Sequence, residues 1–594
     1  MSGGIGADYS RNPSGQHLTN RLTPQSDAPR HCSASPTKPV SLRAFPPPRD
    51  PTAFRPVTGI EHALILLLLL TGLSVVARRL PWPAPISYVV GAGLIGLWPA
   101  FPRIELDPGF FFLCFVPPLL FSDGWLMPLR DFLSAKRPIL TLATGLVVLT
   151  TVAVGLVAWS LVPGLPLAMA FALGAVVSPT DAVAVSAITQ RLKVPARLTA
   201  VLNGESLMND ATGLVAFKFA LTAVALGTFS VRAAAMEFVV LAAGGLSLGL
   251  AISWVIGQLR DVLQRIHGPD VMLETTISLM TPFAAYLAAG ALGLSNILAV
   301  VAAGLYAGWR DPLRMDAATR QVTWTVWSVV LFWLNGLAFV LLGLQLPTIL
   351  ATVSATYTVS QLALFTGAVS GVAIVARLLW FYPGGYVPFL LLNRGANAEP
   401  CPPRAWLLVG GWAGMRGTIT LAAALSIPVT LGDGTPFPGR DIVIFLSAGV
   451  IVVTLLLQGT TLEWLICRLG VRPDDTQVRE DRLARIAAVE AGLQHLRTQI
   501  ARDPADDERG ALRAIIREYE LRLSELTADG DARKTSSRSL AAERSHRLRA
   551  LAAERAALDD LWRRNAITDE THRPLQHLLD YEESLLNGKS IPGA

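Results

Sequence analysis

The sequence has few charged residues for its length. Only 16% of its 594 residues are Asp, Glu, Lys or Arg, whereas a soluble globular chain usually carries about a quarter. Apolar residues make up 52%, the mean hydropathy is +0.46, and charges are sparse between Glu61 and Cys467. This composition excludes an ordinary soluble fold and indicates a protein that crosses a membrane many times.

Cysteine and histidine are also scarce, and neither is placed for a cofactor. The four cysteines lie far apart without metal-ligand spacing, and all eight histidines fall outside the apolar cores of the long stretches. We therefore expect no cofactor. No basic stripe is interleaved with aromatic residues, so we expect no nucleic-acid partner.

Long apolar stretches fill the region with few charges. A helix needs about 20 residues to cross a hydrocarbon layer of about 30 Å. Stretches of about this length cover residues 60–78, 84–100, 109–127, 138–162, 166–189, 198–227, 233–257, 271–290, 292–309, 324–346, 358–382, 404–428 and 440–467. The sequence therefore predicts an all-α polytopic membrane protein with about 13 transmembrane helices in residues 58–469.

The regions outside this domain differ from it in composition. Residues 1–57 are rich in Pro, Ser, Arg and Thr, so we expect a disordered N-terminal tail. Residues 470–594 mix Leu, Ile and Ala with Arg and Glu at helical spacing, which predicts a helical C-terminal tail. Loops after odd-numbered spans hold fifteen Lys and Arg, and the opposite loops hold three. We expect the protein to lie in the plasma membrane. By the positive-inside rule, its C-terminal tail is then cytosolic and its N-terminus external.

The fifth span ends in an unusual polar segment, Ser178-Pro179-Thr180-Asp181. Proline removes a backbone hydrogen bond, and unwound backbone at membrane depth is tolerated only where it lines protein or a water-filled cavity. Broken helices of this kind form the ion sites of secondary transporters. The alternative is a simple proline kink with Asp181 near the membrane interface.

The sixth span carries Glu205, Ser206, Asn209 and Asp210. Ser206 and Asp210 share one helix face, as do Glu205 and Asn209, because each pair is four residues apart. A carboxylate beside a hydroxyl and an amide offers the oxygen ligands that suit Na⁺ or Li⁺. Arg416 of the twelfth span lies beside two glycines, and we expect it to form an interhelical ion pair with Glu205.

These charged groups can lie at a common depth. At 1.5 Å per helical residue, Asp181, Asp210 and Arg416 lie about 13 to 20 Å from the cytoplasmic ends of their spans. This depth is close to the middle of a hydrocarbon core of about 30 Å. The three residues can therefore share one layer.

Three motifs carry a resemblance to a known family. Ser178–Asp181, Gly204–Asp210 and Gly414–Gly417 resemble signatures of the monovalent cation:proton antiporters that include NhaP-type and NHE-type Na⁺/H⁺ exchangers. The resemblance covers about residues 60–467, and the C-terminal tail resembles that of the bacterial YjcE-like branch. It implies a homodimer and two inverted repeats, spans 1–6 and 8–13, with broken crossing helices 5 and 12.

The resemblance also implies residue roles. Asp210 would bind Na⁺ or a proton, with Thr180 and Ser206 assisting coordination and Asp181 supporting the site. Relatives often have an acidic residue after Pro-Pro-Leu-Leu-Phe in the third span, where this chain has Ser122 followed by Asp123. The acid is displaced by one residue, about 100° around the helix, so we do not expect Asp123 to take that place.

The resulting hypothesis is exchange of Na⁺, Li⁺ or K⁺ for H⁺, by competition at Asp210 with alternating access. It would serve intracellular pH and sodium homeostasis. Asn209, where electrogenic relatives carry a second aspartate, predicts electroneutral exchange. An ion channel or a non-transporting sensor on the same scaffold is the alternative. An intramembrane enzyme is a third possibility, for which only the pair Asp181 and Asp210 is available, and we expect no enzymatic activity.

Overall fold

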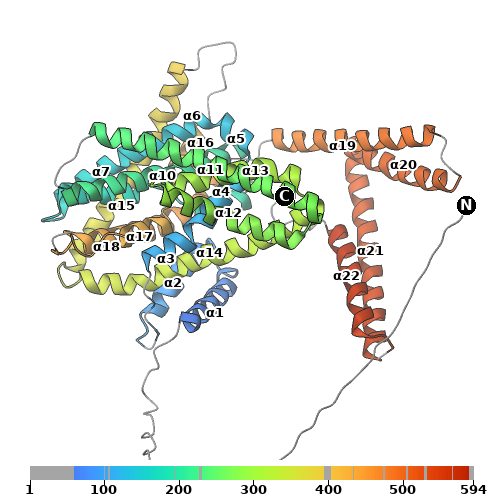
Figure 1. The fold of residues 1–594 in the computed structure, drawn as a ribbon, viewed down its shortest axis with the longest axis horizontal. Helices are drawn as coiled ribbons and strands as arrows, with labels where there is room; N and C mark the ends of the chain where they lie inside the picture. Colours follow the sequence, from blue (N-terminus) through green and yellow to red (C-terminus); the bar gives the residue numbers. More distant parts are fainter. Residues whose placement is uncertain are drawn as a thin grey trace, which may run out of the picture. The chain divides into compact units, whose positions relative to one another are not determined.

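The computed structural model describes residues 59–587, except residues 100, 103, 105–106, 193, 227–230, 393–402, 432–433, 472–474, 503–505, 528–530 and 565. The expected disorder of residues 1–57 lies outside the described residues. The described part of the chain forms helices joined by loops, and its only strand pairing is an isolated bridge between Thr430 and Pro436 (Figure 1). The predicted all-helical fold class is therefore confirmed.

The helices of the apolar region follow the predicted spans. They are α1 (Gly59–Ala77), α2 (Ala84–Gly96), α3 (Pro108–Cys114), α4 (Val116–Leu126), α5 (Leu129–Ser134), α6 (Lys136–Leu140), the π-helical turn η1 (Thr141–Leu146), α7 (Val147–Leu161), α8 (Leu167–Val177), α9 (Ala182–Arg191), α10 (Ala196–Leu226), α11 (Val231–His267), α12 (Val271–Ala291), α13 (Asn296–Arg314), α14 (Ala317–Val353), α15 (Val359–Leu392), α16 (Arg404–Trp412), α17 (Thr418–Leu425) and α18 (Arg440–Arg468).

Each predicted range overlaps at least one of these helices. Within the described residues, 9 spans are long and apolar enough to cross a membrane, and two shorter apolar helices lie in residues 61–96. A chain with this many apolar spans is a multi-pass membrane protein. The number thirteen and the inverted repeats stay predictions.

Several helices, α11 and α14 among them, are longer than predicted. α11 continues to His267 rather than to residue 257, and it ends where Gly268 adopts a φ of 77°, a left-handed conformation that glycine accepts without strain. α14 runs to Val353 and includes Pro347, where the predicted span ended. A proline removes one backbone hydrogen bond and can kink a helix without ending it.

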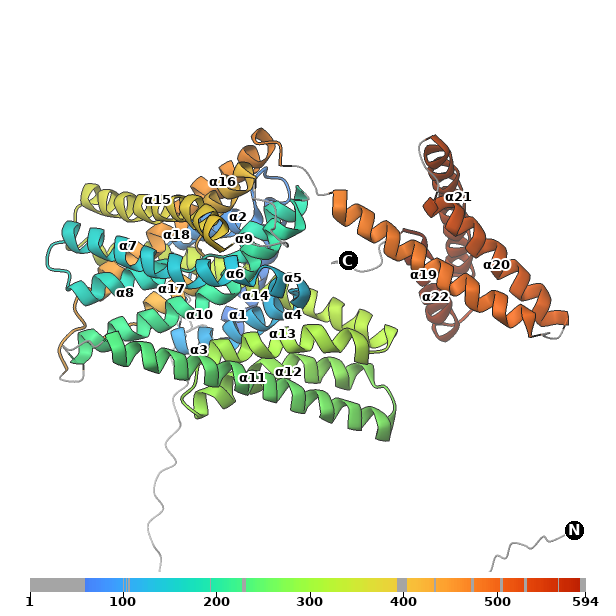
Figure 2. The ribbon, with the colours of Figure 1, turned by 90° about the horizontal axis from the view of Figure 1, so that it is seen from above.

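Close helix packing holds α4 in the scaffold. Helices α11, α12 and α13 pack against one another, and α13 also packs on α4 (Figure 2). A Cβ atom at Gly304 or Gly308 of α13 would overlap the backbone carbonyl of Phe121 or Trp125 of α4. Glycine at these two positions therefore lets the backbones approach and fixes the segment of α4 that carries Asp123.

Two spans are interrupted near their middle, as predicted. Residues 178–181 separate α8 from α9, and residues 413–417 separate α16 from α17. The backbone N–H of Asp181 donates to the carbonyl of Met415 at 2.8 Å. The two breaks therefore meet, and α10 packs beside both α8 and α9.

The C-terminal tail is helical, as predicted. Its helices are α19 (Asp475–Ala501), α20 (Asp506–Thr527), α21 (Asp531–Arg563) and α22 (Asp569–Asn587). α19 packs on α20 and α21 packs on α22, so the tail consists of two helical hairpins (Figure 1). Ion pairs such as Arg497–Glu520 (2.7 Å) and Arg555–Asp580 (2.6 Å) join the paired helices.

Candidate functional site

The break between α8 and α9 shares a set of hydrogen bonds with the middle of α10. The Ser206 hydroxyl donates to the Thr180 carbonyl (2.7 Å) and accepts from the Ala182 N–H (3.1 Å). Asn209 Nδ2 donates to Thr180 Oγ1 (2.9 Å). Thr180, Ser206 and Asn209 are all buried. Three of the predicted site residues are therefore brought together by the fold.

Asp210 follows Asn209 on α10 and is 6% exposed. In the described part of the chain, no donor bonds to its carboxylate, and Asn209 Oδ1 has no hydrogen-bond partner either. The carboxylate lies close enough to Asp123 and Asp181 for their charges to interact. A buried carboxylate with no donor and with like charges nearby needs a compensating cation or proton.

The surrounding oxygens favour one kind of cation. Among the described residues, no three acidic, His or Cys side chains converge closely enough to hold a metal ion. Asp123, Asp181 and Asp210 are therefore not one ligand set. One carboxylate with hydroxyl and amide oxygens carries little total charge, which suits a monovalent cation better than Ca²⁺ or Mg²⁺.

Asp181 lies where the two breaks cross. Its Oδ1 accepts from the Val183 N–H (2.8 Å) and so caps the start of α9. A Cβ atom at Gly417, in the other break, would overlap the Asp181 carboxylate. The interruption is thus more than a proline kink, because Asp181 connects the two unwound segments.

The predicted ion pair between Glu205 and Arg416 is wrong. Glu205 pairs instead with Arg377 of α15, whose Nη2 lies 2.9 Å from Oε2 and whose Nη1 bonds to Oε1. Arg377 is fully buried, and its Nε donates to the Gly410 carbonyl (3.2 Å). Arg416 Nε donates to the Val177 carbonyl (2.6 Å). The glycines beside Arg416 let backbone carbonyls approach its guanidinium, so it is satisfied without the carboxylate.

Ser122 and Asp123 of α4 lie in different surroundings. The Ser122 hydroxyl donates to the Leu119 carbonyl of its own helix (2.7 Å). Asp123 lies within electrostatic range of Asp181 and Asp210. The displacement of the acid by one residue therefore leaves Asp123 in the neighbourhood of the site, while Ser122 bonds within its helix.

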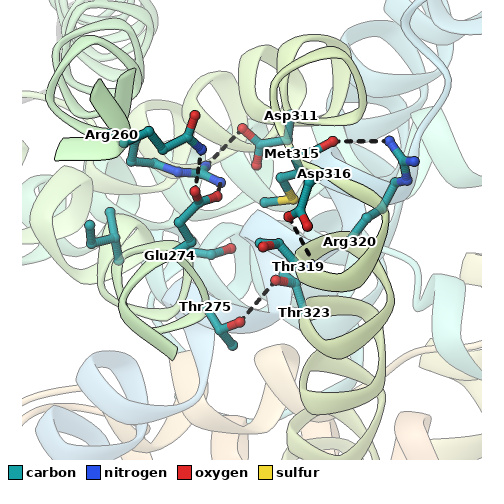
Figure 3. Close-up of polar contacts among 12 residues, drawn as sticks. Arg260, Glu274, Thr275, Asp311, Met315, Asp316, Thr319, Arg320 and Thr323 are labelled. Atoms are coloured by element: carbon teal, nitrogen blue, oxygen red, sulfur yellow. Dashed lines mark hydrogen bonds and ion pairs between the residues drawn. The ribbon is translucent and has the colours of Figure 1, made fainter. Parts of the chain in front are cut away.

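A second group of buried charges was not predicted. Arg260 of α11 donates to Asp311 of α13 (2.9 Å) and to Glu274 of α12 (3.3 Å), as Figure 3 shows. Beside it, the hydroxyls of Thr275 and Thr323 bond to each other at 3.0 Å and link α12 to α14. The partners are far apart along the chain, so no local spacing indicates them. The group ties four helices of the scaffold together.

Known proteins resemble this chain in sequence and in fold. It is 37% identical to the uncharacterized Na⁺/H⁺ exchanger YjcE of Escherichia coli, over 89% of this chain and 99% of that protein. It is 36% identical to a sodium, potassium, lithium and rubidium/H⁺ antiporter of Bacillus subtilis, over 88% of this chain and 77% of that protein.

The structure of the sodium proton antiporter MjNhaP1 from Methanocaldococcus jannaschii shares the fold. It aligns with a TM-score of 0.53 at 18% identity, over 69% of this chain and 98% of that chain. A family model, sodium/hydrogen exchanger, transmembrane, matches residues 65–468. This chain therefore belongs to the transmembrane sodium/hydrogen exchanger family.

Proposed function

We propose that this chain exchanges Na⁺ for H⁺ across the plasma membrane, with Li⁺ or K⁺ as further possible cations. The observation that carries the proposal is the environment of Asp210. Its carboxylate is buried and has no hydrogen-bond donor among the described residues, and charges on Asp123 and Asp181 lie close enough to interact with it. The family and the names of the relatives support the choice of ions.

The proposed mechanism is competition at one carboxylate. Asp123 and Asp181 lie close enough to repel a bare charge on Asp210, so a departing cation is replaced by a proton and a departing proton by a cation. Thr180 and Ser206 supply hydroxyl oxygens beside it. Alternating access would expose this site to each side of the membrane in turn.

Asn209 supports electroneutral exchange, because its amide cannot carry a second proton. One proton then leaves for each monovalent cation that enters, and the membrane potential does not drive the cycle. Such exchange would serve intracellular pH and sodium homeostasis. We further propose a homodimer with the helical tail in the cytosol, as the family resemblance and the basic loops suggest.

Exchange in everted membrane vesicles tests the site. Asp210→Asn should abolish the cation-dependent recovery of a quenched pH dye, because an amide cannot alternate between a proton and a cation. Asp441→Asn, at a position with a 58% exposed side chain, is the matched control and should keep exchange. Unimpaired exchange in Asp210→Asn would refute the assignment.

A second measurement tests the transport mode. Imposing a membrane potential without a gradient of Na⁺, Li⁺ or K⁺ should leave the rate unchanged if exchange is electroneutral. A steady conductance across bilayers without counter-transport would instead identify a channel on this scaffold.

A further inference from the structure

One side of α18 faces the break between α16 and α17. Thr454, Gln458 and Thr461 are four and three residues apart on α18, so they lie on one side of the helix. Thr454 Oγ1 accepts from the Arg416 N–H (3.2 Å), and Thr461 Oγ1 accepts from Trp412 Nε1 (2.9 Å). Gln458 lies between these two contacts and therefore faces the unwound backbone that they flank.

Gln458 is fully buried and lacks a protein partner. It is 0% exposed, and in the described part of the chain neither its Nε2 nor its Oε1 makes a hydrogen bond. A Cβ atom on the next residue, Gly459, would lie 3.4 Å from the Met415 sulfur, which places this turn of α18 against the break. A buried amide without partners destabilises a fold, so such a group usually has a polar ligand.

We propose that Gln458 is a positioning residue that holds a water molecule against the break between α16 and α17. Water suits this amide because it accepts from Nε2 and donates to Oε1 at the same time. The same water can bond to backbone groups that the break leaves outside a regular helix. A cation is disfavoured here, because Gln458 offers a single acceptor and Arg416 nearby is positively charged.

Gln458 acts on the proposed exchange site through the backbone, and in this respect the inference rests on the proposed function. The Met415 carbonyl, inside the break, accepts from the Asp181 N–H at 2.8 Å. A shift of the break therefore moves the segment that carries Thr180 and Asp181. Gln458 supports the geometry of the site without touching the transported ion.

Two variants test this role by transport. Gln458→Met keeps the side-chain volume and removes both hydrogen-bonding groups, and it should raise the Na⁺ concentration for half-maximal exchange about fivefold to tenfold. Gln458→Glu can donate and accept only while its carboxyl is protonated. It should match the wild type at acidic pH and lose exchange as the pH rises. Gln321→Met, at an exposed position of α14, is the control that should leave exchange unchanged.

Hydrogen–deuterium exchange gives a readout that does not depend on transport. In the purified full-length protein without Na⁺, residues 409–418 should exchange faster in Gln458→Met than in the wild type, because the break loses its support. Equal deuterium uptake in Gln458→Met and the wild type, together with an unchanged Na⁺ dependence of transport, would overturn the inference. The Gln458 amide would then be an unpartnered group without a role in the break. Absence of Na⁺/H⁺ exchange in the wild-type protein would instead reject the proposed function. The deuterium uptake would still decide the role of Gln458.

Discussion

Replacing Arg377 with methionine tests the ion pair that holds α15 to α10. Methionine fills similar space without charge, so the Glu205 carboxylate, with a side chain 1% exposed, would stay buried without its partner. Removing one member of a buried ion pair costs about 3–5 kcal/mol, because the remaining charge is uncompensated. The lost bond from Arg377 Nε to the Gly410 carbonyl adds about 1 kcal/mol. We expect Arg377→Met to lower the free energy of unfolding by about this total, measured by thermal unfolding in detergent.

A double variant separates the ion pair from other effects. Glu205→Gln with Arg377→Met removes both charges, and removal of both partners of a buried pair is often close to neutral. It should therefore be more stable than Arg377→Met alone. A second double-mutant cycle combines Glu205→Gln with Arg416→Met. Its coupling energy should be smaller than that of the first cycle, because Arg416 bonds to backbone carbonyls. Additive losses in the first cycle, or stronger coupling in the second, would contradict the assignment of Arg377 as the partner.

Two further substitutions test the crossing of the breaks and the second charged group. Gly417→Ala should impair Na⁺/H⁺ exchange in vesicles, because the added Cβ overlaps the Asp181 carboxylate, whereas Gly371→Ala, with no atom near its Cβ position, should not. Arg260→Met removes the arginine partner of two buried carboxylates, Glu274 and Asp311, and should destabilise the protein by about 3–5 kcal/mol in thermal unfolding. Arg485→Met, in a tail ion pair with a 66% exposed arginine, should have no measurable effect, and equal losses in both would contradict this reasoning.

Local sequence chemistry predicted much of the fold. The length of the apolar stretches indicated the membrane helices, because a segment in lipid must form all its backbone hydrogen bonds within itself. Pro179 marked the break between α8 and α9 for a similar local reason. The pairing of Ser206 with Asp210, and of Glu205 with Asn209, followed from helical spacing alone, since residues four apart lie on the same helix face. The end of α14 was not predictable, because a single proline does not always end a helix, whereas Gly268 marks the end of α11 in the sequence.

The sequence by itself therefore determined the membrane class, the break between α8 and α9 and the polar segment of α10. Only the tertiary structure decided which arginine pairs with Glu205, since Arg377 and Arg416 are both intramembrane guanidinium groups and the partners lie 172 residues apart. The same holds for Arg260 and Asp311, which are 51 residues apart, and for the position of Gln458 at the break. The spacing of residues along one helix can be read directly from the sequence. A contact between helices depends instead on how closely glycines let their backbones approach.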